Sequence, residues 1–234
     1  MASDRPSCLA DGLDSSTYFQ LKSDPTAKTE RLTREKIKRS SIPMEDKWRL
    51  FPSAAKPPHL YGLPKVHKEG VPLRPIVSNI DAPTYKLAQY IARSLQPFAG
   101  RTDSSVKNST EFIHTIKNIE VKEQDVLVSF DVISLFTNTP INDSMQLIKE
   151  LTSEGLPKDF PDLTEFCLKK SYFLWNDKCF QQKEGAAMGS PLSPVVVDIF
   201  MENLEKKAIK AYPKKPSLWI CYVDHTFVIW PHGK

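Results

Sequence analysis

Apolar residues recur along the chain at two spacings, which predict helices and strands. Spacings of three and four residues, typical of amphipathic helices, mark the segments 81–95, 109–119, 139–151, 161–170 and 192–212. Runs of β-branched and aromatic residues, typical of strands, mark the segments 126–130, 172–175, 179–183, 218–223 and 226–230. Because no regular strand–helix–strand repeat connects these segments, the pattern favours an α+β fold over a doubly wound sheet.

The last four of these strands are predicted to form two hairpins. Asn176-Asp177-Lys178 separates the strands of the first pair, and Asp224-His225 separates those of the second pair. Asparagine and aspartate are common in hairpin turns because they tolerate left-handed backbone conformations. We therefore expect both connections to be tight antiparallel turns.

Prolines concentrate in one segment, 52–83, ahead of the first of these helices. The chain has 19 prolines against 8 glycines, and this segment holds Pro52, Pro57, Pro58, Pro64, Pro72, Pro75 and Pro83. Each proline removes a backbone donor and favours extended geometry in the residue before it, which excludes a continuous helix. We expect edge strands within 59–68 and 72–80, joined by a loop.

The N-terminal part of the chain is polar and mixed in charge. We expect residues 1–27 to form a loose leader. Residues 28–40 hold six basic residues against Glu30 and Glu35. Such a run is most often the solvated face of a helix, and a contact with phosphates is the alternative.

The composition is that of a globular protein with a small positive charge. Hydrophobic residues make up 40% and charged residues 26%, which excludes disorder throughout the chain, and the net charge of +4 does not by itself indicate nucleic-acid binding. The four cysteines and five histidines show no metal-binding spacing, so neither a zinc site nor a disulfide framework is expected. The longest apolar stretch, 218–223, is too short to cross a membrane, and no signal peptide begins the chain. We expect an intracellular protein of the nucleus or cytoplasm.

Two aspartates follow strong strand patterns and are candidates for metal binding. Asp131 follows the strand 126–130, and Asp224 follows the strand 218–223. If the strands are neighbours, the carboxylates converge, and at ~4 Å with an effective dielectric constant near 20 their repulsion is about 4 kcal/mol. A divalent cation with a preference for oxygen, Mg²⁺ or Mn²⁺, would relieve it. The alternative is that both are turn residues at strand ends; Asp198 is predicted to be a helix surface residue.

The motifs around these aspartates occur in an order that resembles the palm motifs of reverse transcriptases. They are SFDVISLFTN at 129–138, GAAMGSPLSP at 185–194 and YVDH at 222–225. Upstream, YGLPKVHK at 61–68 and LRPIVS at 73–78 look like the fingers motifs of the same family. The resemblance is closest to the reverse transcriptases of Penelope-like retroelements and runs from about residue 56 to the C-terminus.

The resemblance implies a role for each matching residue. Asp131 and Asp224 would be the catalytic, metal-binding aspartates, with the carbonyl of Val132 as a further metal ligand. Lys65 and Arg74 would hold the triphosphate of the incoming nucleotide, the arginine through its planar fork of donors.

Three more residues would line the nucleotide site. Phe136 would occupy the sugar-gate position, where its ring excludes a ribose 2′-hydroxyl and favours deoxynucleotides. Met188 and Gly189 would form the turn under the templating pair, since glycine allows close backbone approach. Each residue has a simpler alternative: Phe136 as a core aromatic, Met188 as a gap filler, and Lys65 and Arg74 as solvated loop charges.

The resemblance also implies the activity and the partners. We expect the fingers and palm of a right-hand polymerase over 56–234, preceded by a partly helical N-terminal extension over 1–55. The activity would be RNA-directed DNA polymerisation in a retrotransposable element, with Mg²⁺ (or Mn²⁺), an RNA template, a DNA primer and deoxynucleoside triphosphates. The sequence leaves the oligomeric state open.

The sequence departs from the family pattern at two points. His225 stands where members typically carry a second adjacent aspartate, and imidazole nitrogen suits Mg²⁺ less well than oxygen, so weakened metal affinity is expected. The chain stops at Lys234, so the thumb and the GIY-YIG endonuclease typical of Penelope-like elements have no counterpart in it. Two alternatives therefore stay open: a catalytically inactive, nucleic-acid-binding fragment, and a marginally folded chain that needs a partner.

Overall fold

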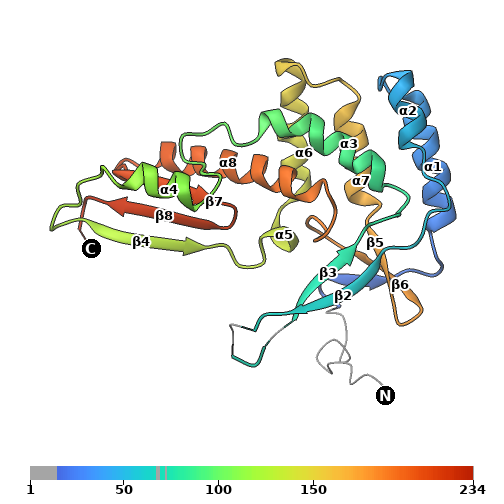
Figure 1. Ribbon diagram of the computed structural model, residues 1–234, viewed down its shortest axis with the longest axis horizontal. Helices are drawn as coiled ribbons and strands as arrows, with labels where there is room; N and C mark the ends of the chain where they lie inside the picture. The colour runs from blue at the N-terminus through green and yellow to red at the C-terminus, as the bar shows by residue number, and fades with distance from the viewer. Residues whose placement is uncertain (1–14, 67–68, 72, 234) are drawn as a thin grey trace.

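Two β-sheets lie at different places along a layer of helices in the computed structural model, which describes residues 15–66, 69–71 and 73–233. Figure 1 shows the three-stranded sheet at one end of the long axis, α1 and α2 at the other, and the five-stranded sheet below the central helices. The first fourteen residues of the predicted leader, Lys68 and Pro72 lie outside the described residues.

The larger sheet has the strand order β1-β6-β5-β2-β3. These strands are β1 (Tyr18–Gln20), β2 (His59–Pro64), β3 (Leu73–Ser78), β5 (Tyr172–Trp175) and β6 (Lys178–Gln182). β2 and β3 pair antiparallel over six residues, from His59 opposite Ser78 to Pro64 opposite Leu73. The proline-rich segment therefore does form two strands, but only β3 is an edge strand. The prediction was wrong for β2, whose first residue also pairs with β5 in parallel.

The N-terminal segment is more ordered than its polar composition suggests. β1 pairs with β6, with Tyr18 opposite Gln182, and α1 begins at Thr26. The prediction of a loose leader was therefore wrong for residues 18–20, because their backbone groups complete the edge of the larger sheet.

The smaller sheet has the order β4-β8-β7. Its strands are β4 (Val126–Asp131), β7 (Leu218–Tyr222) and β8 (His225–Trp230), all antiparallel to their neighbours. The β7–β8 turn is Val223-Asp224, one residue earlier than predicted, because His225 already pairs with Tyr222 and Asp131. The β5–β6 turn is likewise two residues long, with Asn176 and Asp177 both at positive φ.

All five helices predicted from the apolar spacing are present, with ends shifted by a few residues, and α1 covers the basic run 28–40. The helices are α1 (Thr26–Arg39), α2 (Met44–Leu50), α3 (Tyr85–Leu95), α4 (Ser109–Ile116), α5 (Leu135–Asn138), α6 (Ile141–Glu150), α7 (Phe160–Lys169) and α8 (Ser193–Ala211), with short 3₁₀ helices at Gln96–Phe98 and Leu151–Glu154. α2 and α5 were not predicted. α4 ends three residues early, and none of its residues is buried.

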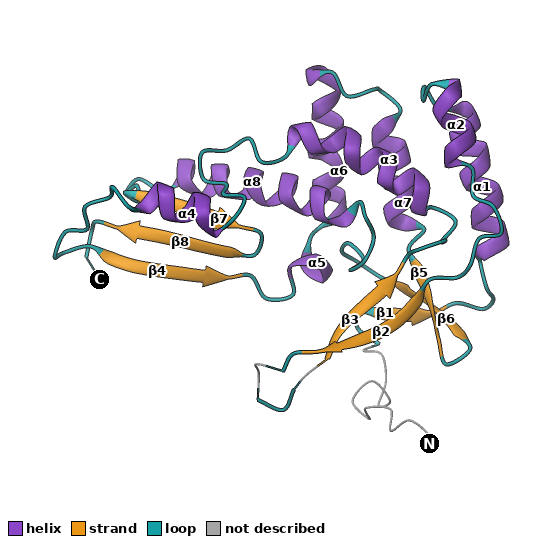
Figure 2. Ribbon diagram, viewed as in Figure 1, coloured by secondary structure: helices purple, strands orange, loops and turns teal. Residues whose placement is uncertain are grey.

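The main core lies among the helices, which Figure 2 shows above the five-stranded sheet. The predicted stripe on α3 is confirmed, since Leu87, Ile91 and Leu95 are fully buried. On α1, the residues that turn inward are mostly threonines, and the exposed side carries the basic residues, with ion pairs Arg31–Glu35 and Arg34–Glu30. This arrangement is the solvated helix face that the sequence predicted.

Candidate active site

The two candidate aspartates meet at one end of the smaller sheet. Asp131 is the last residue of β4 and lies opposite His225, and Asp224 occupies the turn before β8. One ligand atom from each of the three side chains lies within 4.8 Å of the others. The carboxylates therefore converge, although the condition for it was wrong: β4 and β7 are not neighbours, since β8 lies between them, and the β7–β8 turn brings Asp224 to Asp131.

The imidazole of His225 bridges the two carboxylates. Its Nδ1 lies 3.3 Å from Oδ1 of Asp131, and its Nε2 lies 3.5 Å from Oδ1 of Asp224. The side chains are 63%, 60% and 41% exposed for His225, Asp131 and Asp224, so a solvated ion can reach them. The donor set of two carboxylates and one imidazole fits a divalent cation, and the nitrogen favours Mn²⁺ over Mg²⁺. Within the part of the chain that the structure describes, no other group of three such side chains lies as close together.

The backbone of the turn is in an unusual conformation. Val223, which precedes Asp224, has a φ of +56°, in the left-handed region that a β-branched residue rarely adopts. The carbonyl of Asp224 accepts a hydrogen bond of 3.0 Å from the amide of Val132, directly after Asp131. This bond ties the two aspartate-bearing segments together, and the left-handed residue aims the turn toward β4. Strained residues of this kind persist only where the surroundings hold them.

The loop 185–190, which precedes α8, connects the two sheet-bearing regions. The amide of Ala186 donates to the carbonyl of Phe136 at 2.7 Å, and the carbonyl of Met188 accepts from the amide of Val77 at 2.9 Å. Val77 lies in β3, and Phe136 lies in α5, just after β4. The loop therefore fixes the fingers-like hairpin relative to the segment that carries Asp131.

Close packing at this loop explains its two glycines. At Gly189, with φ +100°, an added Cβ would lie 2.1 Å from the carbonyl oxygen of Val77. At Gly185, with φ +79°, a Cβ would lie 2.4 Å from the carbonyl oxygen of Thr137. The close approach at Gly189 is to the backbone of β3, and its role under the templating pair stays a prediction.

The remaining predicted nucleotide-site residues lie on either side of this loop. Phe136 is half-buried and packs against the main core, in agreement with the core alternative, while Met188 is half-buried in the loop. Arg74 is exposed on β3 opposite Leu63, and Lys65 directly follows β2 at the same end of the hairpin. Neither cation forms an ion pair with any described residue, so both are available to an anionic ligand.

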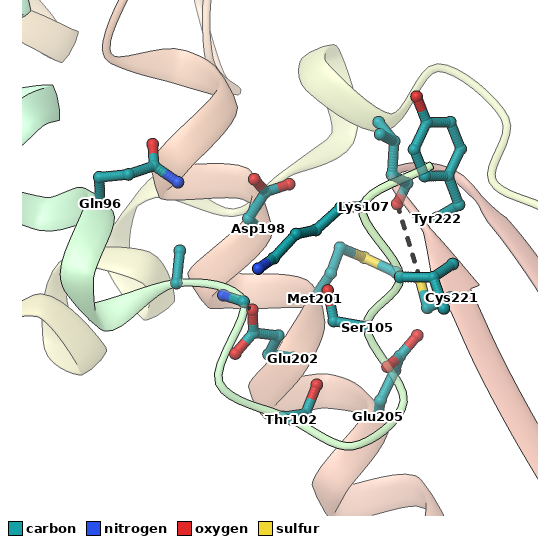
Figure 3. Close-up of a pocket in the computed structure, with 14 residues that line it drawn as sticks. Gln96, Thr102, Ser105, Lys107, Asp198, Met201, Glu202, Glu205, Cys221 and Tyr222 are labelled. Atoms are coloured by element: carbon teal, nitrogen blue, oxygen red, sulfur yellow. Dashed lines mark hydrogen bonds between the residues drawn. The ribbon is translucent and has the colours of Figure 1, made fainter. Parts of the chain in front are cut away.

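A cavity next to the β7–β8 turn contains acidic residues that sequence reasoning assigned to the surface or did not single out. Its volume is about 580 Å³, and its walls come from α8, the segment 99–107 and the end of β7 (Figure 3). Asp198, Glu202 and Glu205 of α8 line it, and Figure 3 shows the side chain of Lys107 extending between Asp198 and Glu202.

Asp198 is half-exposed and lines this cavity, so the surface assignment holds only in part. Burial, followed by the nearby charge of Glu202, raises the pKa of Asp198 to about 6. The cause is the segment 99–107, which covers this side of α8. The only signal in the sequence is that apolar residues flank Asp198 on both sides.

The sequence model of one family, described as reverse transcriptase (RNA-dependent DNA polymerase), matches residues 66–233. The chain belongs to this family. Among curated protein sequences, none matches the chain.

Solved telomerase structures share the fold of this reverse transcriptase. Apo telomerase from Candida tropicalis, truncated from its C-terminal domain, aligns with 96% of this chain and 47% of its own, at 13% identity and a TM-score of 0.60. Telomerase from the same organism with a fragment of telomeric RNA aligns with 92% of this chain and 37% of its own, at 13% identity and a TM-score of 0.62. Telomerase from Candida albicans with a fragment of telomeric RNA aligns with 92% of this chain and 45% of its own, at 11% identity and a TM-score of 0.58.

These alignments confirm the predicted α+β fold of fingers and palm. The chain spans less than half the length of these telomerases. We refer below to the β4-β8-β7 sheet as the palm sheet and to the five-stranded sheet as the fingers sheet. Within the described ranges, no helix is both long and apolar enough to cross a membrane.

Proposed function

We propose that this reverse transcriptase chain carries a nucleotidyl-transfer site for RNA-directed DNA synthesis. The observation that supports it is the convergence of Asp131 and Asp224 at the end of the palm sheet, within 4.8 Å and accessible to solvent. Two carboxylates at this distance repel each other, and a divalent cation relieves the repulsion.

The carboxylates of Asp131 and Asp224, with the carbonyl of Val132, would hold Mg²⁺ or Mn²⁺. A cation bound there would supply Lewis-acid activation of the primer hydroxyl and neutralise charge on the phosphates. The protein's own contribution is positional: the hydrogen bond from Val132 to Asp224 holds both carboxylates toward one point before any ligand arrives.

The nucleotide would lie between the palm sheet and the β2–β3 hairpin. Lys65 and Arg74 would bind its triphosphate, because both are free of ion pairs with the described residues and lie at one end of the hairpin. Phe136, in the short helix after Asp131, would occupy the sugar-gate position and exclude a ribose 2′-hydroxyl. Met188 and Gly189 would support the templating base pair, since their loop is bonded to β3.

The partners and the origin follow from the same proposal. An RNA template, a DNA primer and deoxynucleoside triphosphates are the substrates, and the telomerase structures with telomeric RNA show the same fold in a complex with RNA. The order and wording of the motifs support a Penelope-like retroelement as the origin. Residues 56–234 would form the reverse transcriptase domain, and residues 1–55 an extension.

Primer extension on an RNA template tests the proposal. With Mn²⁺ or Mg²⁺, the wild-type chain should add deoxynucleotides, and Asp131→Asn should abolish the addition. Asp143→Asn, which removes an exposed charge from α6, is the matched control and should retain it. If neither the folded wild type nor His225→Asp adds a nucleotide, the proposed activity is wrong.

A second candidate function is favoured by His225. Because an imidazole replaces a carboxylate beside Asp224, the chain would bind nucleic acid without turnover. Binding would then be dominated by phosphate contacts, so affinity for an RNA–DNA duplex should fall steeply with salt and be equal in wild type and Asp131→Asn. An affinity that does not change with salt would contradict this candidate.

A further inference from the structure

The outer edge of β7 is covered just before it reaches the catalytic turn. Residues 104–106, which we name the edge segment, form a parallel bridge with Cys221. The amide of Cys221 donates to the carbonyl of Ser104 at 2.7 Å, and the amide of Val106 donates to the carbonyl of Cys221 at 3.1 Å. Both backbone groups on the open side of Cys221 are therefore satisfied, three residues before Asp224.

One buried carboxylate holds the edge segment in place. Glu205 of α8 is only 5% exposed, and its Oε2 accepts a hydrogen bond of 3.1 Å from the hydroxyl of Ser104. Oε1 is buried as well and accepts no hydrogen bond of ordinary geometry from the described residues. Burial of a carboxylate with so few hydrogen-bond donors destabilises the folded state. We therefore expect Glu205 to have a function in holding neighbouring segments in place.

The same carboxylate lies against β7 itself. Burial, followed by the neighbouring Glu205, raises the pKa of the Cys221 thiol to about 12. Figure 3 shows Glu205 and Cys221 next to each other at one side of the cavity. Glu205 thus contacts both the strand and the segment that pairs with it, whereas Glu202, one turn earlier on α8, accepts from the amides of Gly100 and Arg101 instead.

The turn that follows depends on such support. Val223 is held in the left-handed region, and the carbonyl of Asp224 must face the amide of Val132 to make its hydrogen bond. That bond holds the turn from the β4 side, and the edge segment holds Cys221 from the other side. Release of either side would let Val223 relax to an ordinary φ and turn Asp224 away from Asp131.

We propose that Glu205 is a positioning residue for the catalytic turn: through Ser104 it holds the edge segment on Cys221 and thereby fixes Asp224 beside Asp131. The proposal rests on the proposed function only for the catalytic role of Asp224. The link from Glu205 to the geometry of the turn depends only on the contacts through Ser104 and Cys221. A substitution of Glu205 should therefore change the amide exchange of Val132, a residue with which Glu205 shares no hydrogen bond.

Amide hydrogen exchange of the full chain, followed residue by residue by NMR without added metal, tests the link. Glu205→Leu keeps the volume but removes the acceptor. It should speed exchange about tenfold at Cys221 and Val106, and also at Val132, while the amide of Val77 in the fingers sheet stays unchanged. Glu205→Gln retains an acceptor for Ser104 and should restore most of the protection.

The controls separate positioning from general stability. Glu165→Gln removes a carboxylate that pairs with Lys169 on the surface of α7, and should leave all four amides at the wild-type rate. If Glu205→Leu fails to fold, Ser104→Ala removes the same hydrogen bond from the side of the edge segment and keeps the carboxylate of Glu205. Faster exchange at Cys221 and Val106 with an unchanged Val132 would overturn the proposal, as would faster exchange at Val77. Absence of primer extension would instead contradict the proposed function alone.

Discussion

At the scale of single residues, His225 sets the properties of the cation site. Its imidazole bridges Asp131 and Asp224 at 3.3 and 3.5 Å, so a cation has to displace it or accept its nitrogen. His225→Asp replaces that nitrogen with oxygen and adds a negative charge. We expect the affinity for Mg²⁺, measured by calorimetric titration, to increase about tenfold. His114→Asp makes the same change on exposed α4 and should have no effect; equal affinities in all three proteins would contradict the account.

A second effect at this scale concerns Asp198. Burial and the charge of Glu202 raise the pKa of Asp198 to about 6 in the folded chain, against 3.8 for an ordinary aspartate. Between these values the folded state holds the proton more tightly than the unfolded state, so this group's contribution to stability is lost as the pH rises from 4 to 6.

Asp198→Asn should therefore be more stable than the wild type at pH 7 and equal to it at pH 4. For a fully buried carboxyl, a rise in pKa from 3.8 to about 6 would correspond to ~3 kcal/mol in the free energy of unfolding. Solvent screening of the half-exposed carboxylate reduces the expected gain to ~1 kcal/mol. Urea denaturation at the two pH values measures the difference; a gain of the same size at both would show that the charge is not the cause.

At the scale of elements, the loop 185–190 joins the fingers sheet to the segment that carries Asp131. Gly189→Ala would place a Cβ 2.1 Å from the carbonyl of Val77, and backbone cannot yield there without breaking the hydrogen bond to Met188. We expect a loss of ~3 kcal/mol or more in the free energy of unfolding. Gly155→Ala is the matched control: its φ of +107° is similar but no atom lies within 4 Å, so a loss of only ~1 kcal/mol is expected. Equal losses in urea denaturation would contradict the close-contact explanation.

The elements also show which features can be predicted from sequence. α3 was predicted because burial on one face leaves a periodic trace in the sequence, and β4 was predicted from its run of β-branched and aromatic residues. β1 was not, since a three-residue edge strand with two exposed side chains has no such trace. The predicted β7–β8 turn was one residue too late, because the pairing of His225 with Tyr222 sets the register of the hairpin. Local propensity would also exclude valine from the left-handed conformation that Val223 adopts.

The same distinction applies to the candidate site. Asp131 and Asp224 follow apolar strand runs, and their motifs are local in sequence, so both were found. Glu205 was not, because its contact with Ser104 joins residues 101 positions apart and leaves no sign in the helical pattern of α8. Contacts of this kind depend on tertiary packing, which a single sequence does not encode in any short window.

At the scale of the whole molecule, the main core lies among the helices, the fingers sheet has a small hydrophobic cluster of its own, and the loop 185–190 connects the fingers sheet to α5, just after β4, through backbone hydrogen bonds. The segment that carries Asp131 is thus part of one hydrogen-bonded framework, and the chain spans less than half of the length of the telomerases that share its fold. A cation should bind to this framework without nucleic acid, because all the protein donors come from β4 and the turn before β8.

The most direct test of the account is the binding of Mn²⁺ to the wild-type chain and to Asp131→Asn and Asp224→Asn, followed by electron paramagnetic resonance of the free ion. The account predicts saturable binding to the wild type, a loss of about tenfold or more in affinity in each variant, and no loss in Asp143→Asn. Binding of equal strength in the wild type and both site variants would show that the two aspartates do not form the cation site.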